Sequence, residues 1–176
     1  MRQARTTLDY DGLALASCLR QPGVVTQLKS SAPRIVLDTN VCLDLFLFND
    51  PQCVDLMAAL RSGAVQAVTR DDCRDEWRRV LHYPQLPIDD KIRPGVSDAF
   101  DALIHHLPAD ASTTHDDASL PRCADPDDQK FLELALASKA SWLISKDKEL
   151  LKLDHRSRIA GLFSILLPQQ WSLTDA

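Results

Sequence analysis

Acidic side chains follow two short apolar runs of this chain, close to the point where each run ends. Asp38 comes directly after residues 35–37, and Asp147 follows residues 142–144 by three positions. The crevice of an open α/β sheet lies outside the carboxyl ends of its strands, so an acid that leaves a buried strand there faces the place where ligands bind. Asp147 can equally be interpreted as the N-cap of the segment that follows it. Two strand exits that carry acids favour a shared carboxylate site.

Glu76 lies on an apolar stripe. Between residues 71 and 81, Cys73, Trp77 and Val80 recur at helical spacing, and Glu76 falls on the same face. An unpaired buried charge is costly, so this position implies a cation, a hydrogen-bond network or the edge of a pocket. The alternative is an acid at the boundary of the core that pairs with Arg79, which contributes roughly a few tenths of a kcal/mol. The sequence leaves both interpretations open.

A third group of acids surrounds Pro126. It consists of Asp125, Asp127 and Asp128, and it precedes a segment whose apolar positions 131, 134 and 135 repeat like one helix face. Pro126 is typical of a first helical residue, which makes Asp125 the predicted N-cap. A cap needs one acid, and like charges this close repel, so three acids suggest that a bound cation offsets the repulsion.

The elements that must position these acids follow from the remaining pattern. Residues 65–68 predict a further strand, and Thr69 and Asp72 have the spacing of a capping box for the helix that carries Glu76. Residues 88–107 look helical, and 108–124 look like a loop near the site.

Each candidate acid lies in a short segment of the chain. In sequence order, these segments are 35–41 (IVLDTNV), 75–81 (DEWRRVL), 125–132 (DPDDQKFL) and 143–147 (LISKD). Together they resemble the four motifs of the PIN domain, and the set is far more specific than any one motif. The resemblance runs from about Arg34 to Trp171, and it is strongest to prokaryotic PIN proteins described as toxin components of toxin-antitoxin systems. Ser145 stands where a Thr is usual, which keeps a hydroxyl near the site.

The resemblance implies a three-layer α/β/α sandwich with a mostly parallel central sheet, and a metal-dependent ribonuclease. The acids of that family map onto Asp38, Glu76, Asp128 and Asp147. Asp38, Asp128 and Asp147 would hold Mg²⁺ or Mn²⁺, which prefer oxygen ligands. Glu76 would bind the ion through water or orient the nucleophile.

Further residues are expected to support this set. Asn40 and Ser145 would steady the ligands by hydrogen bonds, and Asp125 is an additional candidate ligand. Acidic residues outnumber basic ones, 25 to 20, so the whole molecule attracts RNA weakly. Basic residues near the motifs indicate a small basic rim, and the candidates for substrate binding are Arg78, Lys130 and Lys146.

Composition limits the class of protein. With 176 residues and 45% hydrophobic content, the chain can bury a core. Its five cysteines contain no Cys-x-x-Cys pair, which argues against a disulfide framework or a zinc site and favours a reducing cytoplasm. No stretch approaches the roughly 20 apolar residues of a membrane helix.

The predicted domain organisation is an N-terminal extension (1–33), a PIN-like nuclease domain (34–171) and a short tail (172–176). The extension lies outside the resemblance, and we expect a short helix in it that packs on the domain or on a second subunit of a homodimer. An antitoxin protein is the partner that the resemblance implies, beside the RNA substrate.

Two other functions compete with the nuclease. One is a PIN domain with little catalysis that binds RNA or regulates a partner, which an acidic surface would suit. The other is a phosphatase with Asp38 as nucleophile, similar to haloacid dehalogenase-like proteins. Those proteins carry a second Asp two residues later, and Asn40 stands there in this chain.

Overall fold

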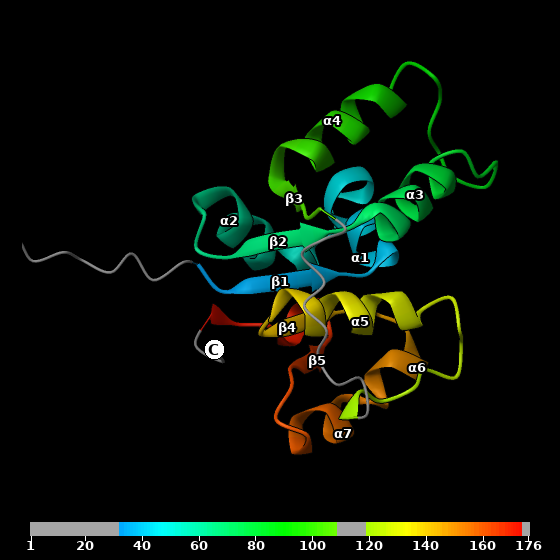
Figure 1. The fold of residues 1–176 in the computed structure, drawn as a ribbon. Helices are drawn as coiled ribbons and strands as arrows, with labels where there is room; N and C mark the ends of the chain where they lie inside the picture. The colour runs from blue at the N-terminus through cyan, green and yellow to red at the C-terminus, as the bar shows by residue number, and fades with distance from the viewer. Residues whose placement is uncertain (1–31, 109–118, 174–176) are drawn as a thin grey trace, which may run out of the picture. The chain divides into compact units, whose positions relative to one another are not determined.

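The computed structural model describes residues 32–108 and 119–173, which belong to the unit that begins at Ser31. The predicted helix of the extension and the end of the tail lie outside the described residues, as does most of the loop predicted over 108–124. Five parallel strands form one sheet in the order β3-β2-β1-β4-β5 (Figure 1). Their bounds are β1 Arg34–Leu37, β2 Gln66–Thr69, β3 Ile104–His106, β4 Trp142–Ile144 and β5 Ser164–Leu166.

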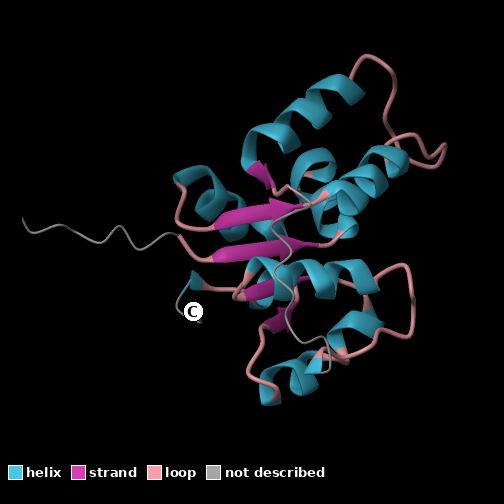
Figure 2. Ribbon diagram, in the orientation of Figure 1, coloured by secondary structure: helices cyan, strands magenta, loops and turns pink. Residues whose placement is uncertain are grey.

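Helices connect the strands and flank them (Figure 2). The α-helices are α1 Thr39–Leu43, α2 Val54–Ser62, α3 Asp71–Val80, α4 Arg93–Leu103, α5 Gln129–Ser138, α6 Lys148–Leu151 and α7 Asp154–Ile159. The described part of the chain also contains a π-helical segment, η1 Asp44–Phe48, and the 3-10 turns η2 Pro51–Cys53 and η5 Pro168–Gln170. Within the part of the chain that is described, no helix is long and apolar enough to cross a membrane.

Two hydrophobic clusters lie on opposite faces of the sheet. Ile35 and Leu37 of β1 belong to one cluster, and Val36 between them belongs to the other. Trp142 and Leu143 of β4 divide in the same way, because successive side chains of a strand point to opposite faces. The first cluster includes residues of α1, α2, α3 and α4, and the second includes residues of α3, α5 and α6. This arrangement confirms the predicted three-layer sandwich.

Three local predictions are wrong. The helix predicted over 88–107 covers only Arg93–Leu103, because the backbone becomes extended at Ile104 and β3 pairs with β2. The capping box at Thr69 is absent, since the Thr69 hydroxyl donates to the backbone oxygen of Arg70, which is itself the N-cap. In the third case α5 begins at Gln129, so its N-cap is Asp128 and not Asp125.

Asp125 has a related but different role. Its carboxylate accepts a hydrogen bond from the Asp127 amide at 2.9 Å, and the Asp128 amide donates to its backbone oxygen at 3.3 Å. The three residues therefore form a turn that precedes the helix, and the first helical turn starts where that turn ends.

Candidate active site

Asp38 is placed by the end of β1 and the start of α1. The strand extends parallel to β4 up to the point where the Asp38 amide donates to the Ile144 carbonyl at 3.0 Å. The backbone oxygen of Asp38 accepts from the amides of Val41 and Cys42, so the residue is the N-cap of α1 without using its carboxylate. The residue as a whole is 4% exposed.

A hydrogen-bonded chain joins Asp38 to the exit of β4. The hydroxyl of Ser145, itself fully buried, donates to Asp38 Oδ2 at 2.6 Å. The Asp147 amide in turn donates to the same hydroxyl at 2.9 Å. Ser145 thereby fixes the orientation of the Asp38 carboxylate relative to β4, as its proposed supporting role requires.

Asp147 is the N-cap of α6, as one of the two sequence interpretations expected. Its Oδ1 accepts from the amides of Glu149 at 2.6 Å and Leu150 at 3.3 Å. Its Oδ2 accepts from no residue in the described ranges. Asp147 can therefore cap α6 with one carboxylate oxygen and offer the other oxygen to a ligand.

The pKa values of two acids are strongly displaced. Burial, supplemented by the charge of Glu76, raises the pKa of Asp38 to about 6 even though the Ser145 hydroxyl opposes the change. Burial also raises the pKa of Asp128 to about 6, and the charges of Asp38, Asp125, Asp147 and Glu76 act in the same direction. In the absence of a cation, these carboxylates repel one another.

Glu76 and Lys130 form an ion pair between α3 and α5. Their side chains are 17% and 16% exposed, so the pair is largely shielded from water. Burial lowers the pKa of Lys130, but the bond to Glu76 more than offsets this and leaves the pKa raised. The partner of Glu76 is thus Lys130, and of the two interpretations left open by the sequence, the ion pair with Arg79 does not form. Because the two residues are far apart in the chain, no local spacing could have indicated this contact.

All four predicted acids line one cavity of about 240 Å³, called here the acidic cavity. Its lining consists of Asp38, Thr39, Asn40, Leu43, Glu76, Val80, Asp128 and Asp147. The side-chain oxygen of Asn40 accepts from the Lys146 amide at 3.4 Å, which joins the α1 end of the cavity to the residue after Ser145.

The basic residues predicted to bind substrate lie in different places. Arg78 is exposed on α3 and lies 3.7 Å from Asp75. The Lys146 ammonium lies 2.6 Å from buried Asp44, a contact that the sequence did not reveal. Neither residue lines the acidic cavity. Lys130 does not line it either, but its ammonium forms an ion pair with Glu76, which does.

The acidic cavity fits a hard divalent cation by its donor set. Its charged groups are all carboxylates, and the pKa values of Asp38 and Asp128 are raised first by burial and then by neighbouring carboxylates, so a bound cation would stabilise their ionised forms. Among the described residues, no three Asp, Glu, His or Cys side chains are already gathered around one point as metal ligands.

Comparison with known proteins agrees with this architecture. The PIN domain family model matches residues 34–149, whereas no curated protein matches the chain. Among solved structures, the chain is similar to the crystal structure of VapBC2 from Rickettsia felis bound to a DNA fragment from their promoter. The TM-score is 0.52 at 13% sequence identity, and the match covers 76% of this chain and 98% of that one. The likeness in structure concerns the fold, whereas the sequence match extends over the four acidic motifs, so this chain belongs to the PIN domain family.

Proposed function

We propose that the protein is a metal-dependent ribonuclease whose reaction takes place in the acidic cavity. One observation carries the proposal: carboxylates that flank or belong to four separate elements line a single cavity, and two of them have pKa values raised to about 6. Displaced pKa values concentrate at functional sites, because catalytic groups need pKa values matched to their task. Membership of the PIN domain family supports the same reaction class.

Asp38, Asp128 and Asp147 would hold Mg²⁺ or Mn²⁺. When bound, such an ion supplies a water of lowered pKa and stabilises the charge that develops on the phosphodiester oxygens. The residues of the chain orient these groups: Ser145 holds the Asp38 carboxylate, and the α6 amides hold one oxygen of Asp147. Lys130 pairs with Glu76 and holds its carboxylate beside the acidic cavity, so Glu76 can orient the attacking water by accepting its hydrogen bond.

The phosphatase alternative fits the site less well. A general acid is needed two residues after the nucleophile, and Asn40 carries no acidic proton. The side-chain oxygen of Asn40 is also engaged by the Lys146 amide. The weakly catalytic RNA-binding module is favoured by one observation, the ion pair in which Lys130 occupies Glu76. The assay below separates it from the nuclease.

A protein partner forms the second part of the proposal. The motifs resemble those of toxin-antitoxin PIN proteins, and the similar VapBC2 structure was determined with DNA from their promoter. A partner that inserts an arginine into the acidic cavity could bridge two of its carboxylates and replace the metal. Co-expression with the neighbouring reading frame, followed by pull-down, tests this part. If no neighbour binds and the protein is harmless when expressed alone, the antitoxin proposal is wrong while the nuclease proposal stands.

Cleavage of single-stranded RNA is the direct test of the main proposal. Purified full-length protein is incubated with a labelled RNA panel in Mg²⁺, in Mn²⁺ and in EDTA. We expect cleavage with either ion and none in EDTA, since the donor set consists of carboxylates that suit these ions. Cleavage that survives EDTA would overturn the mechanism, and binding of RNA without cleavage in any metal would identify a binding module instead.

Variants of Asp147 separate its role as the N-cap of α6 from its proposed role as a metal ligand. Asp147→Asn keeps a good capping side chain, so its stability in EDTA should remain within roughly 0.5 kcal/mol of the wild type. Its cleavage rate should fall by at least about 100-fold because the charge is lost. Asp147→Ala should lose the same activity and also about 1 kcal/mol of stability. Thermal melts and single-turnover cleavage measure both quantities, and full activity in Asp147→Asn would make this residue a cap alone.

A further inference from the structure

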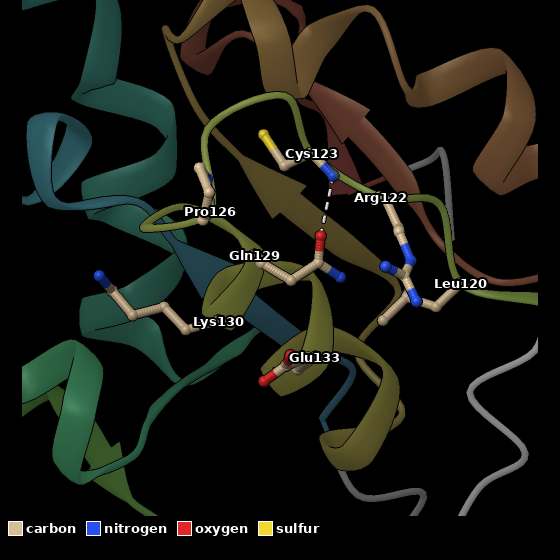
Figure 3. A pocket seen from close by; sticks show the side chains of 7 residues that line it. All are labelled: Leu120, Arg122, Cys123, Pro126, Gln129, Lys130 and Glu133. Carbon is tan, nitrogen blue, oxygen red and sulfur yellow. Dashed lines mark hydrogen bonds between the residues drawn. The ribbon is translucent and has the colours of Figure 1, made fainter.

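A second cavity adjoins the acidic one. It measures about 520 Å³ and is lined by Leu120, Arg122, Cys123, Pro126, Gln129, Lys130 and Glu133 (Figure 3). Lys130 belongs to this lining, and its ammonium contacts Glu76 of the acidic cavity. The consecutive residues Asp128 and Gln129 line the acidic and the second cavity, respectively. The start of α5 and the Lys130 side chain therefore separate the two cavities.

Gln129 holds the wall of the second cavity in place. Its side-chain oxygen accepts from the Cys123 amide at 2.8 Å, the bond drawn in Figure 3. Its side-chain nitrogen donates to the Pro121 carbonyl at 3.4 Å. These two bonds tie the segment before Asp125 to the first turn of α5. The cavity is thus formed before any ligand arrives, which lowers the entropy lost on binding.

Around the second cavity, one cation has no ion-pair partner among the residues that the structure describes. Glu133 pairs with Arg70 at 2.8 Å, and Lys130 pairs with Glu76. Arg122 is exposed and forms an ion pair with no residue in the described ranges. Figure 3 shows Arg122 and Lys130 on either side of the Gln129 side chain. The guanidinium of Arg122 suits a phosphate, and the acidic cavity beside the second cavity suits a metal ion.

We propose that the second cavity binds a nucleotide of the RNA strand next to the phosphodiester that is cleaved, with a phosphate on Arg122. The base lies against the apolar surface of Leu120, Cys123 and Pro126. The volume falls within the roughly 300–1,000 Å³ of small-ligand sites. Contact of bases with such surfaces tolerates different sequences, because every base has an apolar face. This inference rests on the proposed nuclease function and adds to it the path of the strand.

Cys123 provides a test that is independent of catalysis. It lines the second cavity and is half-buried, whereas Cys42, Cys53 and Cys73 are buried. Cys18→Ser removes the cysteine that lies outside the described residues. The full chain with this change is treated with a thiol reagent in EDTA, with and without a 5′-phosphorylated oligoadenylate hexamer. The reaction is run at alkaline pH, because burial raises the pKa of the Cys123 thiol and the thiolate is the reactive form.

We expect the hexamer to slow labelling of Cys123 at least about fivefold at saturation, in proportion to the bound fraction. Arg122→Glu should abolish this protection. Arg156→Glu is the matched control, since Arg156 is exposed on α7 and lines neither cavity. Protection should survive that change. Thermal melts check that all variants are folded.

The outcomes keep this inference apart from the nuclease function. Cleavage of RNA in Mn²⁺ without protection of Cys123 would overturn the subsite and leave the nuclease intact. Protection without cleavage in any metal would support the subsite and remove the nuclease. Protection that persists in Arg122→Glu would also overturn the proposal, and so would failure of the hexamer to bind, measured by fluorescence anisotropy.

Discussion

Asp38→Asn should abolish RNA cleavage and, in EDTA at pH 8, make the folded protein more stable. The loss of activity should be on the order of 10³-fold or more, because a buried ligand charge is removed from the acidic cavity. The amide oxygen of Asn can still accept from Ser145, so the local geometry is retained. With a pKa raised from 3.8 to about 6, the ionised carboxylate costs up to about 3 kcal/mol in the folded state, and the variant is free of that cost.

The dependence of stability on pH should also differ between the wild type and Asp38→Asn. Because the folded state holds the Asp38 proton more tightly than the unfolded state, wild-type stability in EDTA should rise as the pH falls from 8 through about 6 toward 3.8. Asp38→Asn should lose the part of that rise that Asp38 contributes, whereas Asp128, whose pKa is also raised to about 6, should keep contributing to it. Asp72 titrates in a separate range: burial raises its pKa, but the bond from Arg70 outweighs this and lowers it, so its contribution disappears only below 3.8.

Thermal melts over this pH range, with EDTA and with Mn²⁺, measure both effects. Mn²⁺ should raise the melting temperature of the wild type by mass action and leave Asp38→Asn almost unchanged. Asp128→Asn should behave in the same direction, since its pKa is also raised to about 6. A variant that melts far lower in EDTA, or that keeps the full Mn²⁺ effect, would show that the altered acid has a structural role.

Trp77→Ala should cost about 3–5 kcal/mol of stability, a large share of the roughly 5–15 kcal/mol of a whole domain. Trp77 is 2% exposed on α3, and its ring stacks on Phe100 with the ring centroids 4.9 Å apart. The rings of Trp77 and Phe46 lie edge to face, with their centroids 6.1 Å apart. Removal of the indole leaves a cavity under the helix that carries Glu76. We therefore expect a lower melting temperature together with weaker cleavage, which a melt and the RNA assay would detect.

Trp77→Phe is the control for this change. It keeps an aromatic ring against Phe100 and removes an indole nitrogen that has no hydrogen-bond partner among the described residues. Trp77→Phe should lose clearly less folding stability than Trp77→Ala, roughly 1–2 kcal/mol, because less side-chain volume is removed. If the alanine variant melts like the phenylalanine variant, the aromatic cluster contributes less to α3 than its packing indicates.

The sequence predicted the acids at strand exits well, because strand and exit are neighbours in the chain. Asp38 and Asp147 follow β1 and β4, and parallel pairing of those strands brings the two exits to one edge. Contacts between elements that are distant in the chain produce no local sequence pattern from which they could be predicted. The pairing of Glu76 with Lys130 depends on how α3 packs beside α5, and no spacing within either helix encodes it.

Short elements were the other source of error. β3 has three residues and contains two adjacent histidines, so its local pattern does not distinguish it from the end of α4. Its identity comes from pairing with β2. An Asp-Pro pair is typical both of a turn and of a helix start, so the sequence predicts Asp125 as the cap of α5. Only the hydrogen bonds of the folded chain distinguish the two cases, and they place Asp125 in the turn before the helix.

The bond between Ser145 and Asp38 joins residues 107 positions apart, and this separation has a consequence for the timing of synthesis. At about 5–20 residues per second, a ribosome needs on the order of 5–20 s to pass from one to the other. During that interval β1 has no β4 beside it, and Asp147 does not yet exist. Under the proposed function, a growing chain of this protein is harmless to the messenger that encodes it until translation has nearly finished.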